Sequence, residues 1–179
     1  VDFENDSVGT SVRIARDMFT RYIQLMEAGN PQEAQRFRLD GVRLDTSSGM
    51  RDISIEPIGD PALDLGVNPR LVFNVRQALD HCADTWNLPP SQLETARQFC
   101  RQVRIVVSGG FNPEKITRFE KLQVPVDTYA VGSYFFDNHG PTNTDFTADV
   151  VRVKVHDALL DMAKAGRHAA DNPELQRVW

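Results

Sequence analysis

The feature that most constrains the fold is a short apolar segment at 104–107, which ends in a Ser-Gly-Gly sequence and is followed at once by a helix start. Its β-branched residues are typical of a strand that is buried on both faces. Asn112 can cap the helix, and Pro113 suits its first position. Glycines at a strand end let the backbone approach a ligand closely, and a helix N-terminus favours phosphate. The stretch predicts either a phosphate-binding corner of a β/α enzyme or an ordinary strand-to-helix turn.

The composition limits the classes of function. A chain of 179 residues can build one core with a small appendage. Its net charge of -5 disfavours nonspecific binding to nucleic acid or to anionic membranes. No apolar run reaches the roughly 18 residues that a membrane-spanning helix needs. Cys82 and Cys100 fall in helical patterns, as expected of buried thiols in a reducing compartment. We therefore expect a cytoplasmic protein that binds neither nucleic acid nor membranes.

Periodic apolar residues predict an alternation of helices and strands. Helices are expected over 8–26, 69–86, 91–103 and 113–122, the third with a capping box at Ser91 and Glu94. Strands are expected over 40–46, 104–107 and 126–133. The segment 50–66 shows no periodicity, and we expect a long loop there, with an edge strand as an option. Such alternation implies parallel pairing with right-handed crossovers.

The C-terminal region has a different pattern. Residues 146–155 are β-like, and His156-Asp157 suits a hairpin turn. The residues 158–164 that follow fit a strand or a helix, and a last short helix or turn is expected from Asn172. No Cys or His pair has the spacing of a zinc site, so no metal ligand is assigned.

Polar residues and glycines mark three strand ends: Arg43 and Asp45, then Ser108, Gly109 and Gly110, then Gly132 and Ser133. Ligands of parallel β/α folds bind at the carboxyl ends of strands. The glycine corners would offer backbone N–H groups to a phosphate. Asp45 would accept hydrogen bonds from sugar hydroxyls, and Arg43 would bind a phosphate or a carboxylate. Alternatively, Arg43 and Asp45 form only the polar face of a half-exposed strand, and Gly132 only permits a turn.

In this order and spacing, the segments 41–46 (GVRLDT), 106–110 (VVSGG) and 129–133 (YAVGS) resemble the C-terminal part of nicotinate phosphoribosyltransferase and its type II phosphoribosyltransferase relatives. The segments 148–151, 162–167 and 172–173 are similar to that family's closing β segment, and residues 1–3 resemble a barrel strand. The resemblance implies an α/β fold: part of an irregular, TIM-like (β/α)8 barrel over 1–141 and a C-terminal β-rich extension over 142–179. The N-terminal half of the enzyme would then be absent.

The resemblance also implies a reaction. The full enzyme joins nicotinate to phosphoribosyl pyrophosphate, giving nicotinate mononucleotide and pyrophosphate in NAD biosynthesis, with ATP hydrolysed, Mg2+ present and the enzyme a homo-oligomer. By resemblance, Arg43 and Asp45 are the expected catalytic residues, with Asp45 facing the ribose hydroxyls and Arg43 near pyrophosphate or the nicotinate carboxylate. Residues bound to the ribose 5-phosphate would be Ser108, Gly109, Gly110, Gly132 and Ser133.

The chain also departs from the family pattern. Arg-Leu-Asp-Thr replaces the Arg-Leu-Asp-Ser-Gly-Asp of many members, Tyr129-Ala130 stands where Phe-Gly is common, and 53–68 is similar to an insertion. The family's nicotinate-stacking aromatic residue and phosphorylated histidine have no counterpart, so the chain alone is expected to be inactive. Two alternatives stay open: a noncatalytic phosphate-metabolite binding module, and another phosphate-binding (β/α)8 enzyme such as one like quinolinate phosphoribosyltransferase.

Overall fold

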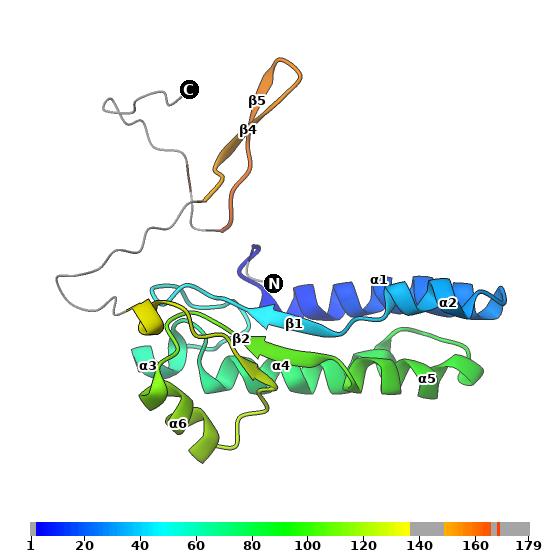
Figure 1. The fold of residues 1–179 in the computed structure, drawn as a ribbon, viewed down its shortest axis with the longest axis horizontal. Coiled ribbons are helices and arrows are strands. Elements are labelled where there is room, and N and C mark those ends of the chain that lie inside the picture. Colours follow the sequence, from blue (N-terminus) through cyan, green and yellow to red (C-terminus); the bar gives the residue numbers. More distant parts are fainter. Residues whose placement is uncertain (1–2, 137–148, 166–167, 169–179) are drawn as a thin grey trace.

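A three-stranded parallel sheet organises the computed structural model, which describes residues 3–136, 149–165 and 168 (Figure 1). Its strands are β1 (Gly41–Leu44), β2 (Arg104–Val107) and β3 (Thr128–Tyr129), in the order β1-β2-β3. Val42 pairs with Ile105, and Val107 pairs with Tyr129. The predicted α/β class with parallel strands is therefore confirmed. Within the described part of the chain the sheet does not close.

Helices precede, separate and follow these strands along the chain. They are α1 (Ser7–Glu27), α2 (Pro31–Ala34), η1 (Gln35–Phe37), α3 (Pro61–Asp64), α4 (Pro69–His81), η2 (Cys82–Thr85), α5 (Pro90–Arg101), α6 (Pro113–Lys121) and η3 (Ser133–Phe136). The four long helices lie where the periodicity predicts them. Described residues form no helix that is long and apolar enough to cross a membrane.

Local sequence explains most helix starts. The Asn68 side chain accepts a hydrogen bond from Leu71 N at 3.0 Å, and Asn112 accepts one from Lys115 N at 2.8 Å. Each cap is followed by a proline at the first helical position, as predicted. The capping box at Ser91 is wrong, because α5 begins one residue earlier at Pro90. Proline has no N–H to lose there, and its fixed φ suits a helix start.

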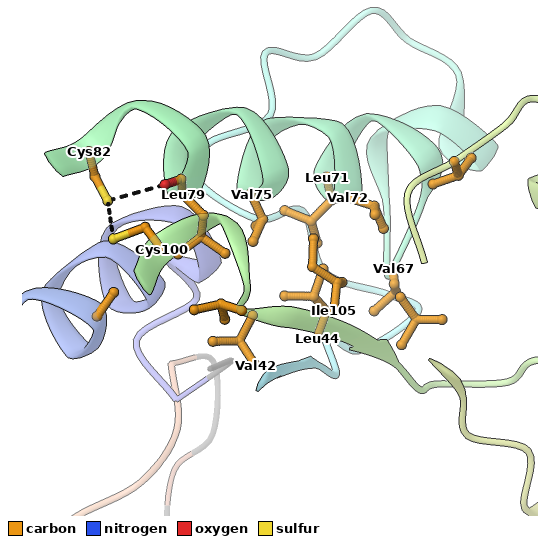
Figure 2. Packing of buried hydrophobic residues seen from close by; sticks show 14 of the residues in the cluster. Val42, Leu44, Val67, Leu71, Val72, Val75, Leu79, Cys82, Cys100 and Ile105 are labelled. Atoms are coloured by element: carbon orange, nitrogen blue, oxygen red, sulfur yellow. Dashed lines mark hydrogen bonds between the residues drawn. The ribbon is translucent and has the colours of Figure 1, made fainter. Parts of the chain in front are cut away.

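One face of the sheet packs against α4. Val42, Leu44, Ile105 and Val107 are at most 4% exposed and belong to one buried cluster with the α4 stripe of Leu71, Val72, Val75 and Leu79. Figure 2 shows Val42, Leu44 and Ile105 facing this stripe. The register places these four strand residues on the same face. On the opposite face Arg43 and Arg104 are exposed and Val106 is half-buried. The expectation that β2 is buried on both faces is therefore wrong for the described residues, since helices cover one face only.

Two buried thiols join α5 to the end of α4. The Sγ atoms of Cys82 and Cys100 lie 3.6 Å apart, and Cys82 Sγ also lies 3.5 Å from Leu79 O (Figure 2). Both cysteines are free and buried, as the sequence predicts. The contact with Cys82 and the burial together raise the pKa of the Cys100 thiol.

The long loop at 50–66 is held by two buried carboxylates and contains α3 in place of the optional edge strand. Asp52 accepts a hydrogen bond from Ser7 N at 2.9 Å. Asp64 accepts hydrogen bonds from the amides of Ile58 and Gly59 and pairs with Arg70 at 2.7 Å. These contacts tie the loop to α1 and α4, next to the carboxyl ends of the strands.

The C-terminal part forms an antiparallel hairpin of β4 (Arg152–Val155) and β5 (Ala158–Asp161), so 158–161 is a strand and the predicted turn at 156–157 is confirmed. Phe3 lies in a turn, so the strand expected at 1–3 is not seen there. Residues 1–2, 146–148 and 172–179 of the predicted elements lie outside the described residues.

Candidate functional site

The carboxyl ends of β1 and β2 border one cavity of about 350 Å³. The segment after β1 contributes Asp45, Thr46, Ser47 and Ser48, and the segment after β2 contributes Gly109 and Gly110. The rest of the lining consists of Asn5, Met50, Asp149, Lys164 and Ala165. Two of the three predicted strand ends therefore meet at a single polar cavity, where parallel sheets bind ligands.

Ser108 connects the two strand ends. Its backbone N donates to Leu44 O at 2.9 Å, which extends the β1–β2 pairing beyond the strands. Its Oγ lies 2.6 Å from Asp45 Oδ1 and 3.0 Å from Leu44 O. The hydroxyl has one hydrogen and donates to one acceptor at a time, and the ionised carboxylate is the closer and stronger acceptor. The structure thus places Ser108 against Asp45 and not among the residues that line the cavity.

Arg43 pairs with the second oxygen of the same carboxylate. Its Nη2 lies 3.4 Å from Asp45 Oδ2, and the Arg43 side chain is 61% exposed against 27% for Asp45. Arg43 does not line the cavity. Its position on the uncovered face of β1 also fits the alternative role, that of a polar residue on a half-exposed strand. Asp45 is therefore held between a buried hydroxyl and an exposed guanidinium.

The two glycines after Ser108 have backbone conformations that disfavour other residues. Gly109 has a φ of +89° and Gly110 a φ of +68°, in the left-handed region. A Cβ atom at Gly109 would lie 3.6 Å from Thr46 O, and one at Gly110 would meet no atom within 4 Å. Backbone conformation, and not lack of space, therefore requires glycine at Gly110.

The helix N-terminus next to these glycines does not border the cavity. Asn112, Glu114 and Lys115 line a separate cavity of about 400 Å³. Lys115 Nζ donates to Gly109 O at 3.1 Å and lies 4.2 Å from the centre of the Phe111 ring. Burial, followed by the nearby charge of Arg118, lowers the pKa of Lys115. The N-terminal end of α6 therefore contacts Gly109 through Lys115. It does not face the cavity, although its sequence position predicts that it would.

The third predicted strand end is also separate. Gly132 is exposed, a Cβ atom there would meet no atom within 4 Å, and the residue does not line the cavity. Ser133 begins η3 and is likewise not among the lining residues. The structure brings together Asp45, Gly109 and Gly110, with Ser108 and Arg43 against Asp45. Gly132 and Ser133 lie beyond that group.

The sequence did not indicate that the C-terminal part reaches this cavity. Asp149 and Lys164 line it, and Lys164 Nζ lies 3.9 Å from Asp149 Oδ1. More than a hundred residues separate them from Asp45, so no local pattern could have shown the contact. Among the described residues that line the cavity, Lys164 is the basic one, against the two carboxylates of Asp45 and Asp149.

The carboxylates of Asp45 and Asp149 are of the ligand type that Mg2+ prefers. Proteins commonly hold Mg2+ by one or two carboxylates together with substrate phosphates. Asp45 and Asp149 supply that number of carboxylates at one cavity. Among the described residues there is no cluster of three or more His, Cys, Asp or Glu side chains that could hold a metal ion by itself.

The fold and site define an α/β protein with a polar cavity at the carboxyl edge of a parallel sheet. Comparison of the chain with models of protein families, with curated proteins and with solved structures finds no match.

Proposed function

We propose that this chain is the phosphoribosyl-binding, C-terminal part of a nicotinate phosphoribosyltransferase. The observation that carries the proposal is the meeting of Asp45 with the left-handed Gly109-Gly110 backbone at the cavity. A ribose phosphate needs hydroxyl acceptors beside a backbone that can approach its phosphate closely. Asp45 supplies the first and the glycines supply the second.

The sheet also supports membership of an irregular (β/α)8 barrel. In such barrels the helices cover the outer face of the strands, and the inner face lines the barrel. Here α4 covers the face of Val42 and Ile105, while the described residues leave the face of Arg43 and Val106 without a helix. That one-sided burial is expected of a barrel segment.

In the proposed reaction, the nicotinate nitrogen forms a bond to ribose C1 while the C1–oxygen bond to pyrophosphate breaks and pyrophosphate leaves. Positive charge develops on the ribose and negative charge on the leaving group. Preorganised charges stabilise such a transition state most effectively. Asp45, oriented by Ser108, would face the ribose, and Lys164 and the backbone at Gly109 and Gly110 would face phosphate oxygens. Mg2+, when held by Asp45 and Asp149 with the substrate, would supply charge neutralisation of the phosphates.

The isolated chain of 179 residues is expected to bind phosphoribosyl pyrophosphate and nicotinate mononucleotide without forming product. Nicotinate stacking and ATP-coupled phosphorylation need the aromatic residue and the histidine for which this sequence has no counterpart. By analogy with the family, we propose a cytoplasmic homo-oligomer. Formation of nicotinate mononucleotide by the isolated chain would contradict this part of the proposal.

Titration calorimetry with phosphoribosyl pyrophosphate tests the phosphate corner. Gly110→Val forces a branched residue into the left-handed region at the cavity and is expected to weaken binding about tenfold or more. Gly29→Val is the matched control, because Gly29 also has a positive φ of +75° with no atom within 4 Å of its Cβ position, and it does not line the cavity. Equal loss in both variants, or no binding by the unaltered chain, would reject the site.

A noncatalytic phosphate-metabolite binding module is the second candidate. The observation that favours it is that Gly132 and Ser133, which the family resemblance places at the phosphate, do not line the cavity. A module of this kind would bind ribose 5-phosphate as tightly as phosphoribosyl pyrophosphate, because it would have no use for the pyrophosphate group. A clear preference for phosphoribosyl pyrophosphate in the same calorimetric experiment favours the transferase, or a relative that acts on quinolinate.

A further inference from the structure

The C-terminal part of the chain supplies the positive charge of the cavity. We infer that Lys164, which follows β5, binds a phosphate or diphosphate group of the substrate directly; this inference rests on the proposed function of the same site. The sequence points to a site made of three strand ends, and the structure brings two of them to the cavity, through Asp45 and through Gly109 and Gly110. The structure adds a third wall made of Asp149, Lys164 and Ala165.

Backbone contacts on either side fix Lys164 at the cavity. Before it, Met162 N donates to Val151 O at 3.1 Å and extends the β4–β5 pairing. After it, Ala165 N donates to Phe3 O at 2.8 Å, in the turn that precedes α1. Lys164 is thus placed between two anchored neighbours, and its side chain is 38% exposed.

The same turn connects this wall to the body of the protein. Asn5, which lines the cavity, donates from Nδ2 to Arg51 O at 2.7 Å. Ile53 N donates to Asn5 O at 3.0 Å. The chain from Phe3 to Asn5 therefore links Ala165 on one side to the 50–66 loop on the other, which holds Lys164 at a defined place beside the strand ends.

A cavity that binds an anion beside two carboxylates requires a positive charge, and Lys164 provides one. Asp45 and Asp149 both line it and both repel an anion. Arg43 pairs with Asp45 from outside the cavity and does not line it. Lys164 Nζ lies 3.9 Å from Asp149 Oδ1 and offsets one of these charges at the cavity, where its ammonium group would donate to phosphate oxygens. Charge-assisted hydrogen bonds of this kind are the strong ones in phosphate recognition.

Titration calorimetry of the full chain with sodium pyrophosphate and, separately, with phosphoribosyl pyrophosphate tests the role of Lys164. Lys164→Gln is expected to weaken pyrophosphate binding by about 10- to 100-fold, and Lys164→Arg is expected to restore part of it. Lys154→Gln is the matched control, because Lys154 lies in the same hairpin, is 64% exposed and does not line the cavity. It is expected to change binding by less than about twofold. Thermal unfolding of each variant checks that the fold is retained.

The two ligands separate failure of the inference from failure of the proposed function. Equal pyrophosphate affinity of the unaltered chain and Lys164→Gln overturns the role of Lys164, while tight binding of phosphoribosyl pyrophosphate in that case still supports the function. Binding of pyrophosphate that depends on Lys164, with no added affinity for phosphoribosyl pyrophosphate, supports Lys164 and rejects the function. Binding of neither ligand by the unaltered chain rejects both.

Discussion

The hydroxyl of Ser108 lies 2.6 Å from Oδ1 of Asp45, so the residue after β2 orients the carboxylate of the residue after β1. Ser108 is 7% exposed, and its position is fixed by the backbone bond to Leu44 O. A carboxylate held in this way keeps its direction before a ligand arrives. We therefore assign Ser108 a positioning role toward Asp45, in place of direct phosphate binding.

Ser108→Ala should weaken ligand binding through Asp45. The variant removes one charge-assisted hydrogen bond, and we expect a loss of about 1–2 kcal/mol in the free energy of unfolding. We also expect weaker binding of phosphoribosyl pyrophosphate with little change for pyrophosphate, which carries no ribose for Asp45 to contact. Thr117→Ala is a suitable control, because the Thr117 hydroxyl donates to Pro113 O at an exposed site. Loss of affinity for both ligands alike would argue against a positioning role.

Among the glycines near the cavity, Gly66 is expected to tolerate substitution least. It has a φ of +62°, and a Cβ there would lie 3.1 Å from Ser48 Cα, in a segment that lines the cavity. Gly66→Ala should therefore cost about 2–3 kcal/mol of unfolding free energy, from the backbone conformation and from overpacking. Gly29→Ala has the backbone cost without the contact and should cost about 1 kcal/mol. Urea denaturation measures the free energy of unfolding of both variants. Equal costs would contradict the expectation, because they would show that the contact with Ser48 adds nothing.

Asp64 should make stability depend on acid pH. Burial raises the pKa of Asp64, but the amides of Gly59 and Ile58 and the charge of Arg70 outweigh it, so the pKa in the folded protein lies below its usual value. The resulting stability is present above the pKa of the unfolded chain, about 3.9, and is lost as pH falls through the folded pKa. Asp64→Asn should therefore lose less stability than the unaltered chain between about pH 5 and pH 3. Urea denaturation at the two pH values checks this, and identical acid dependence would contradict it.

The parts of the fold that follow from neighbouring residues could be predicted from the sequence. Asn112 and Pro113 start α6 as expected, since a cap and a first-turn proline act over three residues. Ser91 failed as a cap because Pro90, one residue earlier, competes for the same helix start. The parallel direction of the strands, seen where β1 pairs with β2, followed from the alternation of strands and helices.

The full composition of the site could not be predicted in the same way. Lys164 reaches the cavity through the hairpin and the contact of Ala165 with Phe3, and neither end of that contact carries a local signal. The direction of α6 also could not be predicted from the apolar periodicity of the sequence. Its N-cap, Asn112, lies two residues after Gly110, yet the left-handed turn and the packing of Phe111, whose ring centre lies 5.0 Å from that of Phe119, direct the helix to a neighbouring cavity.

The most direct test of the proposed phosphoribosyl site is a nuclear magnetic resonance titration of the ¹⁵N-labelled chain with phosphoribosyl pyrophosphate. We predict that the largest amide shift changes fall at Asp45, Gly109 and Gly110, with Lys164 and Ala165 changing at the same ligand concentrations. Unchanged amides at these positions would contradict the proposal. So would changes centred on the separate cavity between α4 and the N-terminus of α6, which Asn68 and Asn112 line.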